Sequence, residues 1–140
     1  MIGALAVEAL LVAGLKPYAV GGLTLGADPL ATAVSLAFYS VGMNVPAFIV
    51  RKQAKDHGTL AWIEGAKTFP AGAELVVLED VVTTGGSSLK AVEKLVEAGF
   101  KVSAILTVVD RLEGARKTIE SKGIKFLSLC TLIDIRGAKI

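Results

Sequence analysis

Short apolar runs alternate along this chain with segments whose apolar residues recur at helical spacing. The runs at 74–80 (ELVVLED) and 101–111 (KVSAILTVVDR) lack a regular polar alternation, which is typical of strands buried on both faces of a sheet. Between them, residues 87–98 carry an apolar stripe at helical spacing, formed by Leu89, Val92, Leu95 and Val96. The pattern therefore predicts a strand, a helix and a second strand in this part of the chain.

The same reasoning divides the rest of the chain into elements of both kinds. Helices are predicted at residues 2–13, 29–41, 87–98 and 113–122. Strands are predicted at residues 18–20, 46–52, 74–80, 101–111 and 125–132. Asp28 and Pro29 fit the N-cap and the first turn of the second helix. Residues 53–72 have no clean period and contain three glycines, which predicts a long loop or a mobile flap.

Alternating strands and helices predict a single α/β domain over residues 1–140. Its expected architecture is an open, mostly parallel sheet with helices on both faces. In such sheets, ligands bind beyond the carboxyl ends of the strands. Three segments of unusual chemistry follow predicted strands: GGLTLGAD (21–28), RKQAKDH (51–57) and EDVVTTGGSS (79–88). We therefore expect these segments to meet at one edge of the sheet.

Composition supports a packed core and disfavours several classes of protein. Hydrophobic residues make up 53% of the chain and charged residues 20%, which is enough apolar surface for a core. A net charge of +2 with 6% aromatic residues does not predict nucleic-acid binding. The single cysteine, Cys130, excludes an internal disulfide and predicts a buried side chain in a reducing cytoplasm. The apolar start is interrupted by Glu8 and has no basic residues, which predicts a buried helix rather than a membrane segment.

The TTGGSS loop at 83–88 has the composition of an anion site. Gly85 and Gly86 permit positive φ and leave space, so that consecutive amides can point toward one guest. The hydroxyl donors of the loop are Thr83, Thr84, Ser87 and Ser88. The loop also opens a predicted helix, whose amino end favours negative charge. A phosphate monoester is the expected guest, and a plain strand-to-helix turn with a serine cap is the alternative. Both standard glycine-rich nucleotide motifs are absent from the sequence, which disfavours ATP and NAD.

Two adjacent acids, Glu79 and Asp80, precede this loop. Ionised carboxylates would repel a phosphate, but they accept hydrogen bonds from vicinal hydroxyl groups. A ribose 5-phosphate suits both the loop and the acids, with its phosphate in the loop and its 2′- and 3′-hydroxyls on the acids. The same acids have the chemistry to help hold Mg²⁺, directly or through water. The alternative is a solvated strand end.

A basic loop follows the predicted strand at 46–52. Arg51, Lys52 and Lys55 place three cations beside the imidazole of His57 within the segment RKQAKDH. Such a loop can clamp a polyanion and cover it during a reaction, or it can be a solvated basic loop. His57 is the only histidine, so a metal cluster built on several histidines is excluded.

GGLTLGAD is a second glycine-rich segment. Gly21, Gly22 and Gly26 would let backbone amides approach a pyrophosphate closely. A tight strand-to-helix turn is the alternative interpretation.

Together these motifs resemble those of the type I phosphoribosyltransferases. VVLEDVVTTGGSS is similar to the motif with which that family binds phosphoribosyl pyrophosphate (PRPP). FIVRKQAKDHG (48–58) and VVDRLEG (108–114) are similar to segments of the orotate phosphoribosyltransferases. The resemblance extends from about Met1 to Ile133 and implies the type I fold, a parallel sheet with flanking helices.

The resemblance also implies roles for the matching residues. The PRPP-binding residues are Arg51, Lys52, Lys55, His57, Glu79, Asp80, Val81, Val82, Thr83, Thr84, Gly85, Gly86 and Ser87. Thr83 and Arg111 match positions that contact orotate, whose carboxylate an arginine can bind in a bidentate pair. The implied catalytic residues are Lys55, His57 and Asp80, with Lys55 or His57 donating a proton to the leaving pyrophosphate.

The implied reaction transfers ribose 5-phosphate from PRPP to orotate, with Mg²⁺ as cofactor. The resemblance further implies a cytoplasmic homodimer in which the 51–57 loop reaches the neighbouring subunit's site, with no nucleic-acid or membrane partner. Family members usually carry a further segment ahead of the position of Met1, so the amino-terminal hood is expected to be reduced or absent. Leu25 stands where some members have a lysine. The alternatives are a PRPP-binding sensor without orotate turnover and transfer to another nucleobase, which Arg111 disfavours because those acceptors lack a carboxylate.

Overall fold

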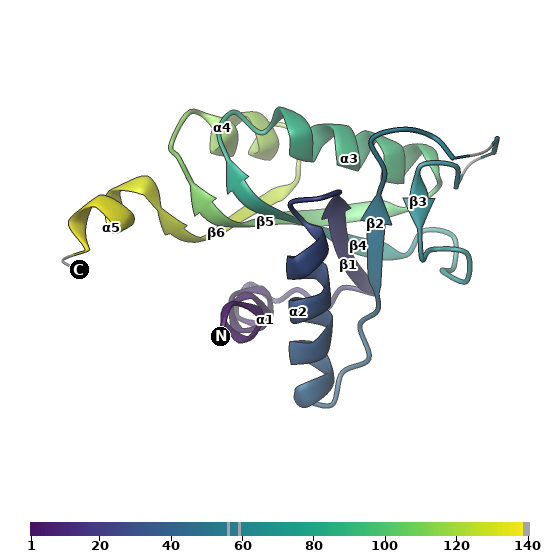
Figure 1. Ribbon diagram of the computed structural model, residues 1–140, viewed down its shortest axis with the longest axis horizontal. Helices are drawn as coiled ribbons and strands as arrows, with labels where there is room; N and C mark the ends of the chain where they lie inside the picture. Colours follow the sequence, from purple (N-terminus) through teal and green to yellow (C-terminus); the bar gives the residue numbers. More distant parts are fainter. Residues whose placement is uncertain (56, 59, 139–140) are drawn as a thin grey trace.

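The computed structural model describes residues 1–55, 57–58 and 60–138, and strands alternate with helices along most of it (Figure 1). The elements are α1 (Ile2–Val12), β1 (Ala19–Leu23), α2 (Asp28–Ser40), β2 (Ala47–Val50), β3 (Ile63–Glu64), β4 (Glu74–Val82), α3 (Gly86–Glu97), β5 (Lys101–Asp110), α4 (Ala115–Glu120), β6 (Lys125–Thr131) and α5 (Leu132–Gly137). The predicted alternation is confirmed, although several boundaries shift by a few residues. None of the described helices is long and apolar enough to cross a membrane.

The strands form one six-stranded sheet with the order β3-β2-β1-β4-β5-β6. All neighbouring pairs are parallel except β2 and β3, which are antiparallel. The open, mostly parallel sheet is therefore confirmed. Because β1, β2, β4 and β5 run in the same direction, the segments that follow them share one edge of the sheet.

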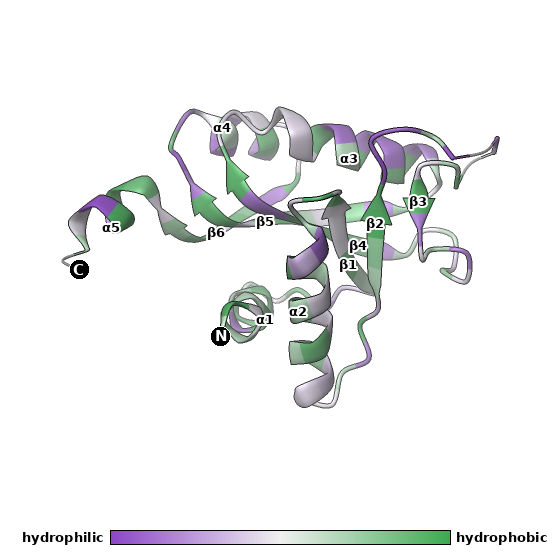
Figure 2. Ribbon diagram, viewed as in Figure 1, coloured by the Kyte–Doolittle hydropathy of each residue, from purple (hydrophilic) through white to green (hydrophobic). Residues whose placement is uncertain are grey.

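Helices cover both faces of this sheet, as Figure 1 shows. On one face, α1 and α2 pack Leu10, Val34 and Phe38 against the sheet. The opposite face is covered by α3 and α4. Side chains of β4 alternate between the two cores, with Val76 and Leu78 on one side and Leu75 and Val77 on the other. Residues 75–78 of β4 are therefore apolar on both faces, and Figure 2 shows green, hydrophobic stretches along the strands of the sheet. Each such buried aliphatic side chain contributes about 1.5–3 kcal/mol to stability.

Three predictions about single residues are corrected. Val96 was expected in the buried stripe of α3, but it is 56% exposed, and the smaller Ala91 is fully buried in its place. Asp28 is the first residue of α2 rather than its N-cap, which is Ala27. Cys130 is only half-buried, because it lies near the end of the edge strand β6, where its Sγ donates to the carbonyl of Val108 at 3.2 Å.

The segment 53–72 is more ordered than a plain loop. It contains β3, which pairs with β2, and its side chains Leu60, Trp62 and Phe69 pack against the core on the α3 face. Residues 56 and 59 of this segment lie outside the described residues. The sequence pattern also missed α5, which begins at a capping box between Thr131 and Asp134.

Candidate functional site

The TTGGSS loop joins the end of β4 to the start of α3. Gly85 is the N-cap of α3 and has a φ of 91°, a left-handed conformation that favours glycine. No side chain caps this helix, so the serine cap expected in the alternative is wrong, and the first amides are left for another acceptor. The loop lines a cavity of about 240 Å³. Its lining consists of Glu79, Val81, Val82, Thr83, Thr84, Gly85, Gly86, Ser87, Ser88 and Lys90.

The predicted phosphate residues do not all present side chains to this cavity. Val82 is 2% exposed and its side chain belongs to the apolar core, so only its backbone is available to a ligand. Val81, Thr84 and Ser87 are exposed, and Thr83 is half-buried. The loop therefore offers mainly amides and hydroxyl groups, which suit a phosphate.

The two acids have different environments. Glu79 is buried and its Oε2 accepts a hydrogen bond of 2.9 Å from Ser88 Oγ on α3. Burial raises the pKa of Glu79, and the bond from Ser88 partly opposes that rise. Asp80 is exposed, and its Oδ1 accepts from the amide of Val81 at 2.8 Å. Adjacent strand residues face opposite sides of a sheet, so Glu79 belongs to the α3 side and Asp80 to the α2 side.

The turn between β1 and α2 approaches Asp80. A Cβ added to Gly26 would lie 3.0 Å from Asp80 Oδ1. Gly21 and Gly22, in contrast, lie inside β1, where a side chain would overlap the carbonyl oxygens of Phe48 and Leu78. The hypothesis that these two glycines open the turn to a pyrophosphate is wrong, since they are needed for close packing of the sheet. Gly26 alone of the three lies in the turn.

The basic residues after β2 divide between two cavities. The guanidinium of Arg51 pairs with Glu64, the last residue of β3, and this contact lowers the pKa of the Glu64 carboxyl. Lys55 lines a cavity of about 340 Å³ whose other charged residues are Glu64 and Lys67. Lys52, Lys55 and His57 are all exposed. We call the TTGGSS loop (83–88) the phosphate loop and the cavity that it lines the phosphate-loop cavity. Lys55 does not line the phosphate-loop cavity of its own chain.

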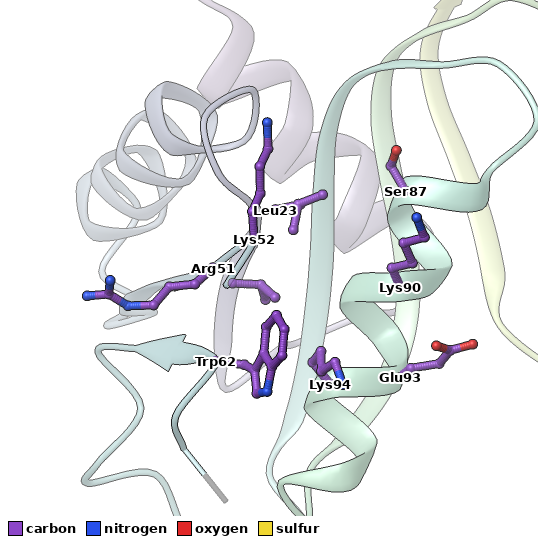
Figure 3. Close-up of a pocket in the computed structure, with 9 residues that line it drawn as sticks. Leu23, Arg51, Lys52, Trp62, Ser87, Lys90, Glu93 and Lys94 are labelled. Atoms are coloured by element: carbon purple, nitrogen blue, oxygen red, sulfur yellow. The ribbon is translucent and has the colours of Figure 1, made fainter. Parts of the chain in front are cut away.

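A third cavity, of about 410 Å³, lies between the end of β2 and α3 (Figure 3). It adjoins the phosphate-loop cavity, because Ser87 and Lys90 line both. Trp62 stands in its wall, with Lys94 Nζ 4.5 Å from the ring centroid. Figure 3 shows the guanidinium of Arg51 directed away from α3. Sequence reasoning missed Trp62, although a lone tryptophan in a segment without periodicity was a usable signal.

Arg111 and Thr83 lie at the carboxyl ends of neighbouring strands. The amide of Arg111 donates to the carbonyl of Val82 at 3.0 Å, directly before the phosphate loop. Its guanidinium pairs with Glu113 at 3.1 Å and is half exposed, so it is accessible to a ligand. Thr107, another residue that the sequence did not single out, is fully buried, and its hydroxyl donor lies 3.1 Å from the carbonyl of Val109 and 3.3 Å from that of Asp80. The second contact joins β5 to the acidic end of β4.

Protein ligands for a metal are few at this edge. Within the part of the chain that the structure describes, no three His, Cys, Asp or Glu side chains cluster closely enough to hold an ion. Mg²⁺ is commonly held by one or two carboxylates, several waters and substrate phosphates. Glu79 and Asp80 therefore fit a site in which Mg²⁺ is held jointly by these carboxylates, by waters and by substrate phosphates.

The helix-opening TTGGSS loop, the two acids and the basic segment all follow parallel strands at one edge of the sheet, where α/β proteins commonly bind phosphorylated ligands. The chain belongs to the phosphoribosyl transferase domain family, which it matches over residues 2–135. A curated orotate phosphoribosyltransferase from a Nostoc species is 48% identical over 136 residues, which are 96% of this chain and 66% of the relative. This chain thus spans about two thirds of that relative's length.

Solved structures agree with the sequence relatives. The orotate phosphoribosyltransferase of Mycobacterium tuberculosis is 44% identical to this chain, with a TM-score of 0.85 over 98% of this chain and 74% of its own. A second structure of that protein, in complex with PRPP, is 40% identical, with a TM-score of 0.79 over 96% of this chain and 74% of its own. The type I fold and the family expected from the motifs are confirmed.

Proposed function

We propose that this chain transfers ribose 5-phosphate from PRPP to orotate, giving orotidine 5′-phosphate and pyrophosphate. The observation that carries the proposal is the meeting of the uncapped phosphate loop, the Glu79–Asp80 pair and the accessible guanidinium of Arg111 at one edge. The first two features suit the ribose 5-phosphate of the donor. Arg111 suits the carboxylate that distinguishes orotate from other nucleobases.

On this proposal, the donor is held at two points. The first amides of α3 and the hydroxyl groups of the loop bind the 5-phosphate, while Glu79 and Asp80 accept hydrogen bonds from the ribose hydroxyls. The C1′–O bond to pyrophosphate then breaks with oxocarbenium-like character, and its electron pair leaves with the pyrophosphate. N1 of orotate attacks C1′ from the opposite face and gives up its proton to water. The chain contributes mainly by holding the two reactants in this orientation. Mg²⁺, bound through Glu79 or Asp80 together with the substrate, would neutralise phosphate charge.

The basic loop is proposed to serve the pyrophosphate of a neighbouring subunit in a homodimer. Lys55 and His57 are exposed, and the cavity that Lys55 lines is separate from the phosphate-loop cavity. Such side chains are available to a second copy of the chain, where Lys55 or His57 would donate a proton to the leaving group. A cytoplasmic location stays a prediction, in keeping with the lone cysteine.

The direct assay mixes the protein with Mg²⁺, PRPP and orotate and follows the absorbance of orotate. Consumption of orotate that depends on PRPP supports the proposed transfer. Unchanged orotate, with PRPP still binding by calorimetry, would reject the transfer and favour the sensor. Adenine and uracil in place of orotate test the remaining alternative.

Arg111→Gln is expected to weaken orotate use and leave PRPP binding unchanged. Glutamine cannot form the charged, bidentate pair with a carboxylate, so KM for orotate should rise about 10- to 100-fold. Initial rates against orotate and calorimetry with PRPP measure the two effects. Arg116→Gln is the matched control, because Arg116 is also a half-exposed arginine paired with a glutamate. Equal KM values for the two variants would argue against this role of Arg111.

Gly26→Ala is expected to weaken PRPP binding by about tenfold. The added Cβ would lie 3.0 Å from Asp80 Oδ1, so the carboxylate proposed for the ribose hydroxyl must shift by a few tenths of an ångström. Calorimetry measures the affinity, and thermal unfolding checks that stability is retained. Gly137→Ala is the control, since its Cβ would meet no atom within 4 Å. Wild-type affinity in Gly26→Ala would show that Asp80 does not need this position.

A further inference from the structure

The cavity of about 410 Å³ beside α3 adjoins the proposed donor site but extends beyond it. Val50, Trp62 and Lys94 are among its lining residues, and we call it the tryptophan cavity. Its volume falls within the range of about 300–1,000 Å³ that is typical of small-molecule sites. Neither Trp62 nor Lys94 lines the phosphate-loop cavity, and the proposed transfer uses neither of them. The tryptophan cavity is therefore a candidate site for a ligand of its own.

The inner wall of the tryptophan cavity is apolar. Leu23 is the last residue of β1, Val50 is the last residue of β2, and Trp62 directly precedes β3. Val50 is fully buried, whereas Leu23 and Trp62 are half-buried and pack against the core on the α3 face. A planar aromatic ring that packs against an indole gains both apolar burial and an offset or edge contact. This wall therefore suits an aromatic ring better than a bare inorganic ion.

Lysines on two sides of the tryptophan cavity give it an excess of positive charge. Lys90 and Lys94 lie one turn apart on α3, and Lys52 lies across from them, after β2 (Figure 3). Among the described residues, Glu93 is the only acid in the lining, and Figure 3 shows its carboxylate directed away from the indole. Lys94 is paired with Glu97, but none of the ion pairs in the described part of the chain includes Lys52 or Lys90. These two lysines favour an anionic group.

We propose that the tryptophan cavity is a second ligand site, for a small molecule that combines a planar aromatic ring with a phosphate. The ring packs against Trp62, and the phosphate is held by Lys52 and Lys90. The spacing suits such a molecule, because Lys94 Nζ lies 4.5 Å from the centroid of the Trp62 ring and Lys90 lies about 6 Å farther along the axis of α3. Nucleoside monophosphates belong to this chemical class. The inference stands apart from the proposed transfer of ribose 5-phosphate.

The fluorescence of Trp62 tests the proposal directly, because it is the only tryptophan of the chain. Phenyl phosphate is the probe, and inorganic phosphate and benzyl alcohol each carry one half of its chemistry. We expect phenyl phosphate to change the emission of Trp62 with saturation, and to bind at least about tenfold more tightly than either fragment. No saturable change up to about 10 mM phenyl phosphate, or equal binding of inorganic phosphate, would overturn the proposal.

Trp62→Leu keeps an apolar side chain in the wall but removes the aromatic partner of the ring. Calorimetry is expected to show that phenyl phosphate binds about tenfold more weakly, near the affinity of inorganic phosphate. Binding of ribose 5-phosphate should stay at the wild-type level, since Trp62 does not line the phosphate-loop cavity. Wild-type affinity for phenyl phosphate in this variant, or an equal loss of ribose 5-phosphate binding, would contradict a separate aromatic site.

Glu93→Gln tests the charge of the cavity without changing the core. Removal of the acid from the lining is expected to tighten phenyl phosphate binding about two- to fivefold. Glu8→Gln is the matched control, because Glu8 is also an exposed acid on a helix but lies on α1, outside this lining. Equal affinities in the two variants would place the probe outside the cavity and overturn the inference, even if Trp62→Leu does not fold. A wild-type protein that binds phenyl phosphate but not ribose 5-phosphate would reject only the proposed function.

Discussion

Gly85→Val is expected to raise the Kd for PRPP at least about 100-fold. Gly85 has a φ of 91°, which a β-branched residue adopts only with strain. Its Cβ would also lie 3.2 Å from Ile119 Cδ1, so one of the two side chains must shift by a few tenths of an ångström. The strained residue directly precedes the amides proposed to hold the 5-phosphate. Calorimetric titration with PRPP measures the effect.

Loss of stability must be separated from loss of the phosphate site. Gly99 has the same φ of 91° just beyond the other end of α3, and its Cβ would meet no atom within 4 Å. Gly99→Val therefore carries the same backbone strain and should lower the temperature of unfolding while keeping wild-type affinity for PRPP. Equal losses of affinity in both variants would mean that strain, and not the amides of the loop, explains the effect.

Lys55→Ala is expected to lower kcat about 100- to 10,000-fold, the range for removal of a general acid. The lysine is exposed and outside the phosphate-loop cavity, so we expect its effect through the proposed second chain. Steady-state rates with saturating PRPP and orotate measure the loss. Lys67→Ala is the control, because Lys67 is exposed and lines the same cavity as Lys55.

Mixing two inactive variants tests whether the loop serves the neighbouring subunit. A heterodimer of Lys55→Ala and Asp80→Asn chains would contain one site with both native residues. After random exchange, activity should recover to about one quarter of the wild-type value. No recovery, with exchange of chains demonstrated, would show that Lys55 acts only beside the Asp80 of its own chain.

The sequence predicted best the features that depend on the conformation of single residues or on a regular pattern of apolar residues. Runs such as VVL in β4 must be apolar on both faces because helices cover both sides of the sheet. The phosphate loop was predictable because Gly85 needs a positive φ and because the loop opens a helix. The position of the segments after β1, β2 and β4 at one edge was predictable because parallel strands end at the same edge of a sheet.

What escaped prediction depends on contacts between residues distant in the sequence. Nothing local shows that the hydroxyl of Ser88 turns to Glu79 rather than to the loop, since nine positions separate them. In the sequence, Gly22 cannot be told from a glycine of the following turn. The structure shows that it lies in β1, with the carbonyl of Leu78 against it. The two-residue strand β3 is defined by its pairing with β2, and the local sequence does not show this pairing.

The central claim is a two-part receptor, with amides and hydroxyl groups for a phosphate and two acids for a ribose diol. Calorimetry of ribose 5-phosphate, ribose and inorganic phosphate against the wild-type protein tests it most directly. We predict that ribose 5-phosphate binds with one site per chain and at least about tenfold more tightly than either fragment. Ribose 5-phosphate that binds no more tightly than inorganic phosphate would contradict the account.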